Sequence, residues 1–390
     1  MVINVMKISK LLIVISMFLS VSATACTAEK EPVSSSAPVI EKQEEEKKPV
    51  TVSASLFMVG DALLHQPVEN SVVQPDGSYA FTCLDRIGAI ASDYDLRYYN
   101  QETILGGDYF GVQGYPRFNG MQAWGNYMTD QLGFNIVSLA NNHSLDMDME
   151  GLTNSVNYWK GKQDVLTSGT YLSQEDYDRI EVREVNGISY SFISYTYGMN
   201  GLYPPEGEEY AVACYRGRED ELLNKVSKAK EMADVVIVAM HWGDEYNTEP
   251  NEEEVTLAQQ LSDVGADIII GNHPHCIQPV EWLNDHKTIC FYALGNCVSG
   301  QYDLSRIEMM AGLTINKTTE PDGKVEVRID DVHCDLMYNY FDDLYFNNFN
   351  VVPFYQMSDD TYVANHEQVY EEYKQIVTAR DSSITVGGFE

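Results

Sequence analysis

The chain has 390 residues, 44% of them hydrophobic, which is enough to bury one large core or two. Its 59 acidic and 25 basic side chains give a formal net charge of -34 at pH 7. No basic patch stands out in the sequence, so nucleic acid is excluded as an expected partner. An acidic surface of this kind favours solubility, attracts cations and repels polyanions.

The first 26 residues have the pattern of a bacterial export signal. Lys7 and Lys10 precede an apolar run at 11–19, which is shorter than a membrane span. Small residues then lead to Cys26, as in a lipoprotein signal, with Ala23 where a large aliphatic residue is usual. We expect a lipidated Cys26 and an extracytoplasmic lipoprotein anchored to the cell membrane. Ordinary secretory cleavage and a retained anchor are the alternatives.

Composition divides the remaining chain into three parts. Residues 27–52 are rich in Glu, Lys, Ser and Pro and predict a disordered tether. Residues 53–335 hold the predicted globular domain, and residues 336–390 form an aromatic-rich C-terminal extension with one helix. The six cysteines after Cys26 are widely and irregularly spaced, which favours buried free thiols over a disulfide framework.

The predicted elements alternate between strand and helix early in the domain and are mostly strands later. Asn186 and Gly187, between two alternating segments, predict a hairpin within 179–195. This order predicts an α/β fold, with a mixed sheet or two stacked sheets flanked by helices. The predicted strands are 53–59, 96–99, 135–140, 234–240, 266–270, 288–294, 311–315 and 325–332, and the predicted helices are 84–92, 121–132, 149–162, 219–232, one capped by Asn251, and 367–378.

Acidic, amide and imidazole side chains recur where the predicted strands end. One histidine at a strand end is commonly structural, but five strand ends that each supply such a group are hard to explain by packing. Mixed carboxylate, imidazole and amide ligands suit Zn, Mn or Fe, and two such ions can activate a water. We therefore predict a divalent metal site, most simply with two ions. The residues concerned are Asp61, Glu102, Asn142 with His143, His241, and His273 with His275.

His273 and His275 follow the predicted strand 266–270 with one residue between them. If this segment is extended, the alternation of side chains directs both imidazoles toward one site.

Short motifs run in order between about residues 56 and 301, and each is weak alone but specific in combination. They are Val59–Asp61 with His65, Asn100–Glu102, Ala140–Asp146, Tyr195–Gly198, His241–Tyr246, Gly271–His275 and Tyr292–Asn296. Together they resemble the CapA family of poly-γ-glutamate capsule proteins.

The resemblance implies a fold and a role for each residue. The family is similar to the calcineurin-like metallophosphatases, which implies a four-layer α/β/β/α sandwich with a dinuclear site. The implied roles are Asp61 and His275 on the first metal, Asn142, His241 and His273 on the second, Glu102 at the bridging position, and His143 as general acid or transition-state donor. The sequence departs from the parent pattern at Leu63, where a histidine is usual, and at Glu102, where an aspartate is usual.

Three further residues are candidates near this site. Asp146 either steadies His143 as a catalytic partner or caps a helix. Arg117 either anchors a substrate carboxylate or is a plain surface arginine. His65, two residues beyond Leu63, is a candidate for contact with substrate.

Three functions compete. The first is a membrane-anchored CapA-like protein that acts in synthesis, export or trimming of poly-γ-glutamate or a related envelope polymer, by metal-dependent hydrolysis or acyl transfer. Its partners would be that anionic polymer or capsule-synthesis proteins. The net charge of -34 opposes an anionic substrate unless metal ions offset it. The second is a secreted metallophosphoesterase, and the third is a non-catalytic envelope scaffold lipoprotein.

Overall fold

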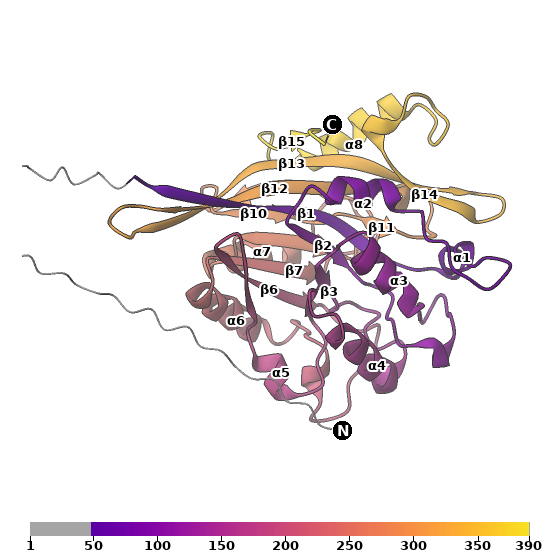
Figure 1. Cartoon of the computed structure of the whole chain (residues 1–390), viewed down its shortest axis with the longest axis horizontal. Helices are drawn as coiled ribbons and strands as arrows, with labels where there is room; N and C mark the ends of the chain where they lie inside the picture. Colours follow the sequence, from indigo (N-terminus) through magenta and orange to yellow (C-terminus); the bar gives the residue numbers. More distant parts are fainter. Residues whose placement is uncertain (1–47, 390) are drawn as a thin grey trace, which may run out of the picture. The chain divides into compact units, whose positions relative to one another are not determined.

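Two stacked β-sheets form the centre of the chain in the computed structural model, which describes residues 48–389 (Figure 1). The predicted signal peptide, Cys26 and most of the predicted tether lie outside the described residues. The larger sheet contains nine strands: β1 (Val50–Ala62), β2 (Leu96–Asn100), β3 (Ile136–Ser138), β4 (Leu166–Ser168), β11 (Asn296–Val298), β12 (Ile307–Thr319), β13 (Val325–Asp342), β14 (Asn347–Pro353) and β15 (Thr385–Val386). Its order is β14-β13-β12-β1-β2-β3-β4, with β11 paired to β1 and β15 paired to β13.

The smaller sheet contains six strands: β5 (Val182–Val185), β6 (Ile188–Thr196), β7 (Val235–His241), β8 (Ile268–Asn272), β9 (Val280–Leu283) and β10 (Thr288–Phe291). Its order is β5-β6-β7-β8-β10-β9. The helices are α1 (Gln66–Ser71), α2 (Asp85–Ala91), α3 (Gln122–Asn126), α4 (Asp148–Lys160), α5 (Gln174–Asp178), α6 (Glu219–Met232), α7 (Glu252–Asp263) and α8 (His366–Val377). None of the helices in residues 48–389 is both long enough and apolar enough to span a membrane.

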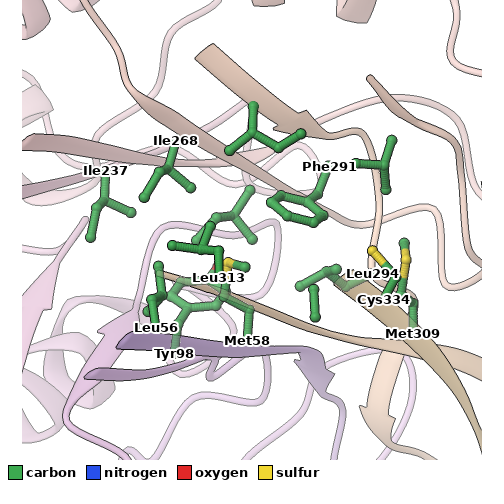
Figure 2. Packing of buried hydrophobic residues seen from close by; sticks show 14 of the residues in the cluster. Leu56, Met58, Tyr98, Ile237, Ile268, Phe291, Leu294, Met309, Leu313 and Cys334 are labelled. Atoms are coloured by element: carbon green, nitrogen blue, oxygen red, sulfur yellow. The ribbon is translucent and has the colours of Figure 1, made fainter. Parts of the chain in front are cut away.

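The side chains of β1 alternate between two cores. Leu56 and Met58 face the space between the sheets, where they meet Ile237 and Ile268 of the smaller sheet (Figure 2). Phe57, between them in sequence, belongs to the core under the helices. Both faces of the strand are therefore covered, which explains its continuous apolar run.

Helices cover the outer face of each sheet. The core outside the larger sheet includes residues of α2, α3 and α4, and the core outside the smaller sheet includes residues of α6 and α7. This arrangement confirms the predicted α/β/β/α sandwich. The hairpin prediction is also confirmed, because Asn186 and Gly187 both have positive φ and join β5 to β6. Helix α7 begins with the predicted cap, in which Asn251 and Glu254 bond each other's backbone N–H.

Several predicted boundaries differ from the structure, and two of these differences change how the chain is assigned to the sheets. The predicted strand 288–294 ends at Phe291, because the chain then leaves the smaller sheet and enters the larger one at β11. Gly295, with a φ of +74°, makes this crossing possible. The predicted boundary at residue 335 falls inside β13, so residues on both sides share one sheet. The helix predicted at 367–378 corresponds to α8, which lies beside β13 together with β15 (Figure 1).

The six cysteines of the described residues are free thiols, five buried and Cys214 half-buried, as the spacing predicts.

Candidate metal centre

The carboxyl ends of β1, β2, β7 and β8 bring carboxylate and imidazole side chains together. β1 runs parallel to β2, and β7 runs parallel to β8, so each sheet presents two neighbouring strand ends at one edge. Asp61 lies in the last two residues of β1, Glu102 follows β2 by two residues, and His241 ends β7. The structure thus gathers the strand-end residues predicted from the sequence into one buried cluster.

Two overlapping sets of side chains each have the composition of a metal site. Glu102, His241 and His273 form one set, and Asp61, Glu102 and His275 form the other, with ligand atoms within 4.8 Å of one another. Glu102 Oε1 lies 3.6 Å from His241 Nε2 and 3.8 Å from His275 Nε2. Asp61 Oδ2 lies 3.8 Å from His275 Nδ1. Glu102 is therefore common to both sets, as a bridging ligand must be.

The unpartnered atoms of the cluster fit a cation. Glu102 is fully buried, and neither carboxylate oxygen has a hydrogen-bond partner among residues 48–389. His273 Nδ1 is also buried without a partner there. Buried polar atoms of this kind cost free energy unless something pairs with them. Because the donors are carboxylates and imidazoles, the residues fit a divalent ion such as Zn, Mn or Fe.

Burial shifts the pKa values of the cluster toward the neutral forms. It raises the pKa of Asp61 to about 7, and it raises the pKa of Glu102, to which the charge of Asp61 adds. Burial lowers the pKa of His273 to about 3 and lowers the pKa values of His241 and His275 as well. Neutral imidazole is the form that binds a metal ion, and a divalent cation would restore the charge of the two carboxylates.

His273 and His275 reach the cluster from a bend, not from an extended strand. β8 ends at Asn272, and the two histidines have φ values of +100° and +56°. Both rings reach the cluster as predicted, but the predicted cause, the alternation of side chains along a strand, is wrong. The bend instead places the two histidines in different sets around Glu102, with ring centroids 5.9 Å apart. The left-handed conformation of His273 is held by its N–H, which donates to Asp61 Oδ2 at 2.9 Å.

Amide side chains orient the set formed by Asp61, Glu102 and His275. Asn100 Nδ2 donates to Asp61 Oδ1 at 2.8 Å. Asn296 Oδ1 lies 3.0 Å from His275 Nδ1, while the Asn296 amide nitrogen is used as a donor elsewhere. The proton of neutral His275 is therefore placed on Nδ1, and Nε2, which faces Glu102, is left as the ligand atom. Beside the set formed by Glu102, His241 and His273, Asn142 Oδ1 lies 2.9 Å from His241 Nε2.

His143 is held by Asp146. His143 Nδ1 lies 2.6 Å from Asp146 Oδ2, which also accepts from the N–H of Phe118 at 2.6 Å. Both side chains are buried. The cap position of α4 is Met147, so Asp146 orients the imidazole and does not cap the helix. Nε2 is the ring nitrogen of His143 that this contact with Asp146 does not use.

The two predicted substrate contacts lie outside the metal-ligand sets. Arg117 pairs with Asp148 at 2.9 Å, and its side chain is 42% exposed. His65 accepts from the N–H of Gly300, and its ring centroid lies 5.2 Å from that of Phe118. The Phe118 ring in turn lies 4.7 Å from the His143 ring, so His65 is linked to the site through Phe118.

Three further residues border the cluster. Glu245 is exposed and forms a third possible set with His273 and His275. The Tyr197 ring lies 4.7 Å from the His273 ring, and the Arg216 guanidinium lies 4.9 Å from the centre of the Tyr197 ring. Glu245 and Tyr197 belong to motifs identified in the sequence, so the sequence could have indicated that they lie near the site. Arg216 belongs to none of those motifs, and only the folded chain brings it near.

The fold and the cluster define an α/β/β/α protein with a candidate site for a divalent metal. The sequence profile of the family described as bacterial capsule synthesis protein PGA_cap matches residues 55–301. This match spans more than half of the chain, so the chain belongs to that family, and the resemblance inferred from the motifs is confirmed.

Curated relatives carry similar names. PGA biosynthesis protein CapA of Bacillus subtilis (strain 168) is 30% identical over 213 residues, which is 52% of each chain. Capsule biosynthesis protein CapA of Bacillus anthracis is 32% identical over 176 residues, 44% of this chain and 41% of the relative. The chain thus spans about half the length of the curated relatives it matches.

Solved structures with a similar course of the chain include two phosphatases. A phosphatase from Mycoplasma pneumoniae is 14% identical with a TM-score of 0.43, over 75% of this chain and 96% of that one. The purple acid phosphatase PPD1 from yellow lupin (Lupinus luteus) is 10% identical with a TM-score of 0.34, over 71% of this chain and 53% of that one.

Proposed function

We propose that this protein is a metal-dependent enzyme of the bacterial envelope that cleaves or transfers amide bonds of poly-γ-glutamate or a related anionic polymer. The observation that carries this proposal is Glu102, a fully buried carboxylate with two unpartnered oxygens between two histidine-containing sets. Such an arrangement is costly for a scaffold and useful for a dinuclear centre. Family membership supplies the class of polymer.

In this proposal each residue has a separate role. Asp61, Glu102 and His275 would hold one ion, and Glu102, Asn142, His241 and His273 would hold the other. Bound ions would polarise the scissile carbonyl and make water a stronger nucleophile. His143 donates a proton from Nε2 to the leaving amine, and Asp146 keeps the proton of Nδ1 in place.

The acidic protein needs local positive charge to accept an anionic polymer. The two arginines that flank the cluster are already paired, Arg117 with Asp148 and Arg216 with Glu253. Their net contribution is therefore small, and the bound ions supply most of the attraction. It follows that metal removal should abolish polymer binding at the centre as well as turnover.

The test uses purified protein that has been chelated and then reloaded with Mn²⁺ or Zn²⁺. The protein is incubated with poly-γ-glutamate, and polymer length is followed by size-exclusion chromatography, with free glutamate added in a second series to favour transfer. The expected result is a metal-dependent change in length that is lost in His143→Gln and retained in the surface control Asp322→Asn, in the exposed turn between β12 and β13. No change with either ion would overturn the proposal.

A phosphodiester substrate, bis(p-nitrophenyl) phosphate, separates the competing functions in the same preparations. Turnover of this compound without any change in the polymer identifies a metallophosphoesterase. A purified protein that contains no metal by elemental analysis and changes neither substrate identifies a scaffold.

We also propose that Cys26 is lipidated and that the domain faces the extracytoplasmic side. This rests on the N-terminal sequence, which lies outside the described residues. Incorporation of labelled palmitate and release of the protein from the membrane fraction in Cys26→Ala test it. Membrane association that Cys26→Ala leaves unchanged would refute lipid anchoring.

A further inference from the structure

A cavity of about 550 Å³ lies between the end strand β4 of the larger sheet and the β5–β6 edge of the smaller sheet. The end of α4 and the segment around α5 complete its walls. We call it the basic cavity. None of the residues assigned to the metal centre lines it, so it is a separate feature of the fold.

The lining of the basic cavity is positive in a strongly negative protein. Five basic and two acidic side chains line it, although acidic residues outnumber basic ones 59 to 25 in the whole chain. Asp176 serves two of the cations, Lys160 at 2.9 Å and Arg179 at 3.2 Å. Glu181 pairs with Arg183 at 2.9 Å. Lys162 pairs with Asp130, which is not part of the lining, at 2.7 Å. Lys225 is thus the one lining cation without an ion pair in the described part of the chain, and the lining keeps an excess of positive side chains that attracts anions.

Lys225, on α6, is the most deeply placed of these cations. It is 9% exposed, and its Nζ donates to the backbone oxygen of Tyr177. The charges of Asp178 and Glu221 act on this ammonium, but neither forms an ion pair with it within residues 48–389, and Glu221 pairs with Arg218. The rings of Tyr177 and Tyr171 lie 4.5 Å and 5.5 Å from Nζ. Burial lowers the pKa of Lys225 to about 8. A buried ammonium of this kind gains from an anionic partner.

Two further groups bordering the cavity lack partners. Trp159 Nε1 and Ser191 Oγ are buried and have no hydrogen-bond partner in the described part of the chain. Both can donate to an oxygen. Apolar side chains such as Ile180 and Phe192 line the cavity as well, so its walls combine donors with surface that suits methylene groups.

We propose that the basic cavity is a second binding site, for carboxylate groups carried on short aliphatic chains. Free glutamate and the pendant carboxylates of a γ-linked glutamate chain share this chemistry. The volume of about 550 Å³ is in the range of ligand pockets. The choice of the γ-linked chain as one source rests on the proposed function, whereas the site itself does not.

The experiment is isothermal titration calorimetry of the full-length protein after its metal ions have been removed with a chelating resin, so that the metal centre takes no part. The probes are sodium glutamate and a short γ-linked glutamate oligomer, with sodium chloride at matched ionic strength as the blank. Saturable binding of either carboxylate probe is expected. Binding of the oligomer alone identifies the polymer as the source, and binding of both identifies the shared carboxylate.

Variants locate the binding. Ser191→Ala and Lys225→Met should each weaken it about tenfold or more, because the first removes a hydroxyl that can donate to the carboxylate and the second removes a charged partner. Lys228→Gln, which removes the same charge from an exposed position of α6 outside the cavity, should leave it unchanged. Ser191 Oγ has no hydrogen-bond partner among residues 48–389, so its variant keeps the test valid if Lys225→Met does not fold.

Two results would overturn the proposal: no saturable binding of either probe, or binding that neither cavity variant weakens. Failure of the proposed function is distinguishable, because it appears as a lack of polymer turnover with metal and leaves this titration of the metal-free protein unaffected.

Discussion

Replacing Glu102 with glutamine should change the stability of the protein in opposite directions with and without metal. Glu102 is fully buried, its carboxylate oxygens have no partner in residues 48–389, and burial raises its pKa. In EDTA the neutral amide avoids the cost of a buried acid without a cation. We expect the free energy of unfolding at neutral pH to rise by about 1–2 kcal/mol.

With metal the sign reverses. An ion present at about 100 times its Kd stabilises the wild-type fold by about 2.7 kcal/mol. Loss of the shared anionic ligand should weaken binding by about 100-fold or more, since even the outer partners of metal ligands are worth about 10–100-fold. At the same ion concentration, the ion then stabilises the folded Glu102→Gln variant by only about 0.4 kcal/mol.

The assay is urea unfolding followed by circular dichroism, in EDTA and in fixed Mn²⁺ or Zn²⁺. Glu69→Gln is the matched control, because Glu69 is also fully buried but accepts from Met121 N and Trp124 Nε1, away from the cluster. The ion should stabilise the Glu69→Gln control as much as it stabilises the wild-type protein. If Glu102→Gln gains as much from metal as the wild type, Glu102 does not hold the ion.

Further predictions concern positioning, pH and packing. Asp146→Asn should lower the free energy of unfolding in urea by about 1–3 kcal/mol, because it weakens a buried 2.6 Å contact with His143. Asp148→Asn, with a side chain that is 76% exposed, should change this free energy by no more than about 0.5 kcal/mol. Equal losses in the two variants would contradict the role of Asp146. Burial raises the folded pKa of Glu69 from 4.5 to about 8, so the folded state keeps a proton that the unfolded chain releases, and stability should fall with pH in that window. The slope relative to Glu69→Gln should approach about 1.4 kcal/mol per pH unit in unfolding experiments, and parallel profiles would refute it. Gly60→Ala should lower the free energy of unfolding by more than about 3 kcal/mol, because its Cβ would lie 1.8 Å from the Gly295 backbone oxygen. A Cβ at Gly198 meets nothing within 4 Å, so Gly198→Ala should be tolerated. Similar thermal unfolding of the two variants would contradict this account.

Local features of the sequence determined much of the fold. The apolar runs predicted the central strands, and the Asn251 cap and the helical spacing predicted α7 and α6. The turn chemistry of Asn186 and Gly187 predicted the hairpin. These features depend on neighbours in sequence, so residues close along the chain are sufficient to predict them. Short strands such as β4 and β9 were missed, since runs of three or four residues carry little periodicity.

The candidate site was predicted as a set of residues but not as a geometry. Motifs at the strand ends indicated which side chains to expect, because parallel strands deliver their ends to one edge. The sharing of Glu102 between two ligand sets depends on how the two sheets are stacked. The direction of His273 and His275 depends on a bend with positive φ, which no alternation rule contains.

The sequence by itself determined the family, the strand-end ligand types and most of the elements, because motifs and periodicity are local. Only the tertiary structure decided which atoms face one another, since that depends on sheet stacking and on the crossing from β10 to β11. The basic cavity shows the same division: the sequence has no basic patch, yet folding brings Lys160, Arg183 and Lys225 to one cavity. Charges far apart along the chain act together only after the strands and helices that carry them have packed.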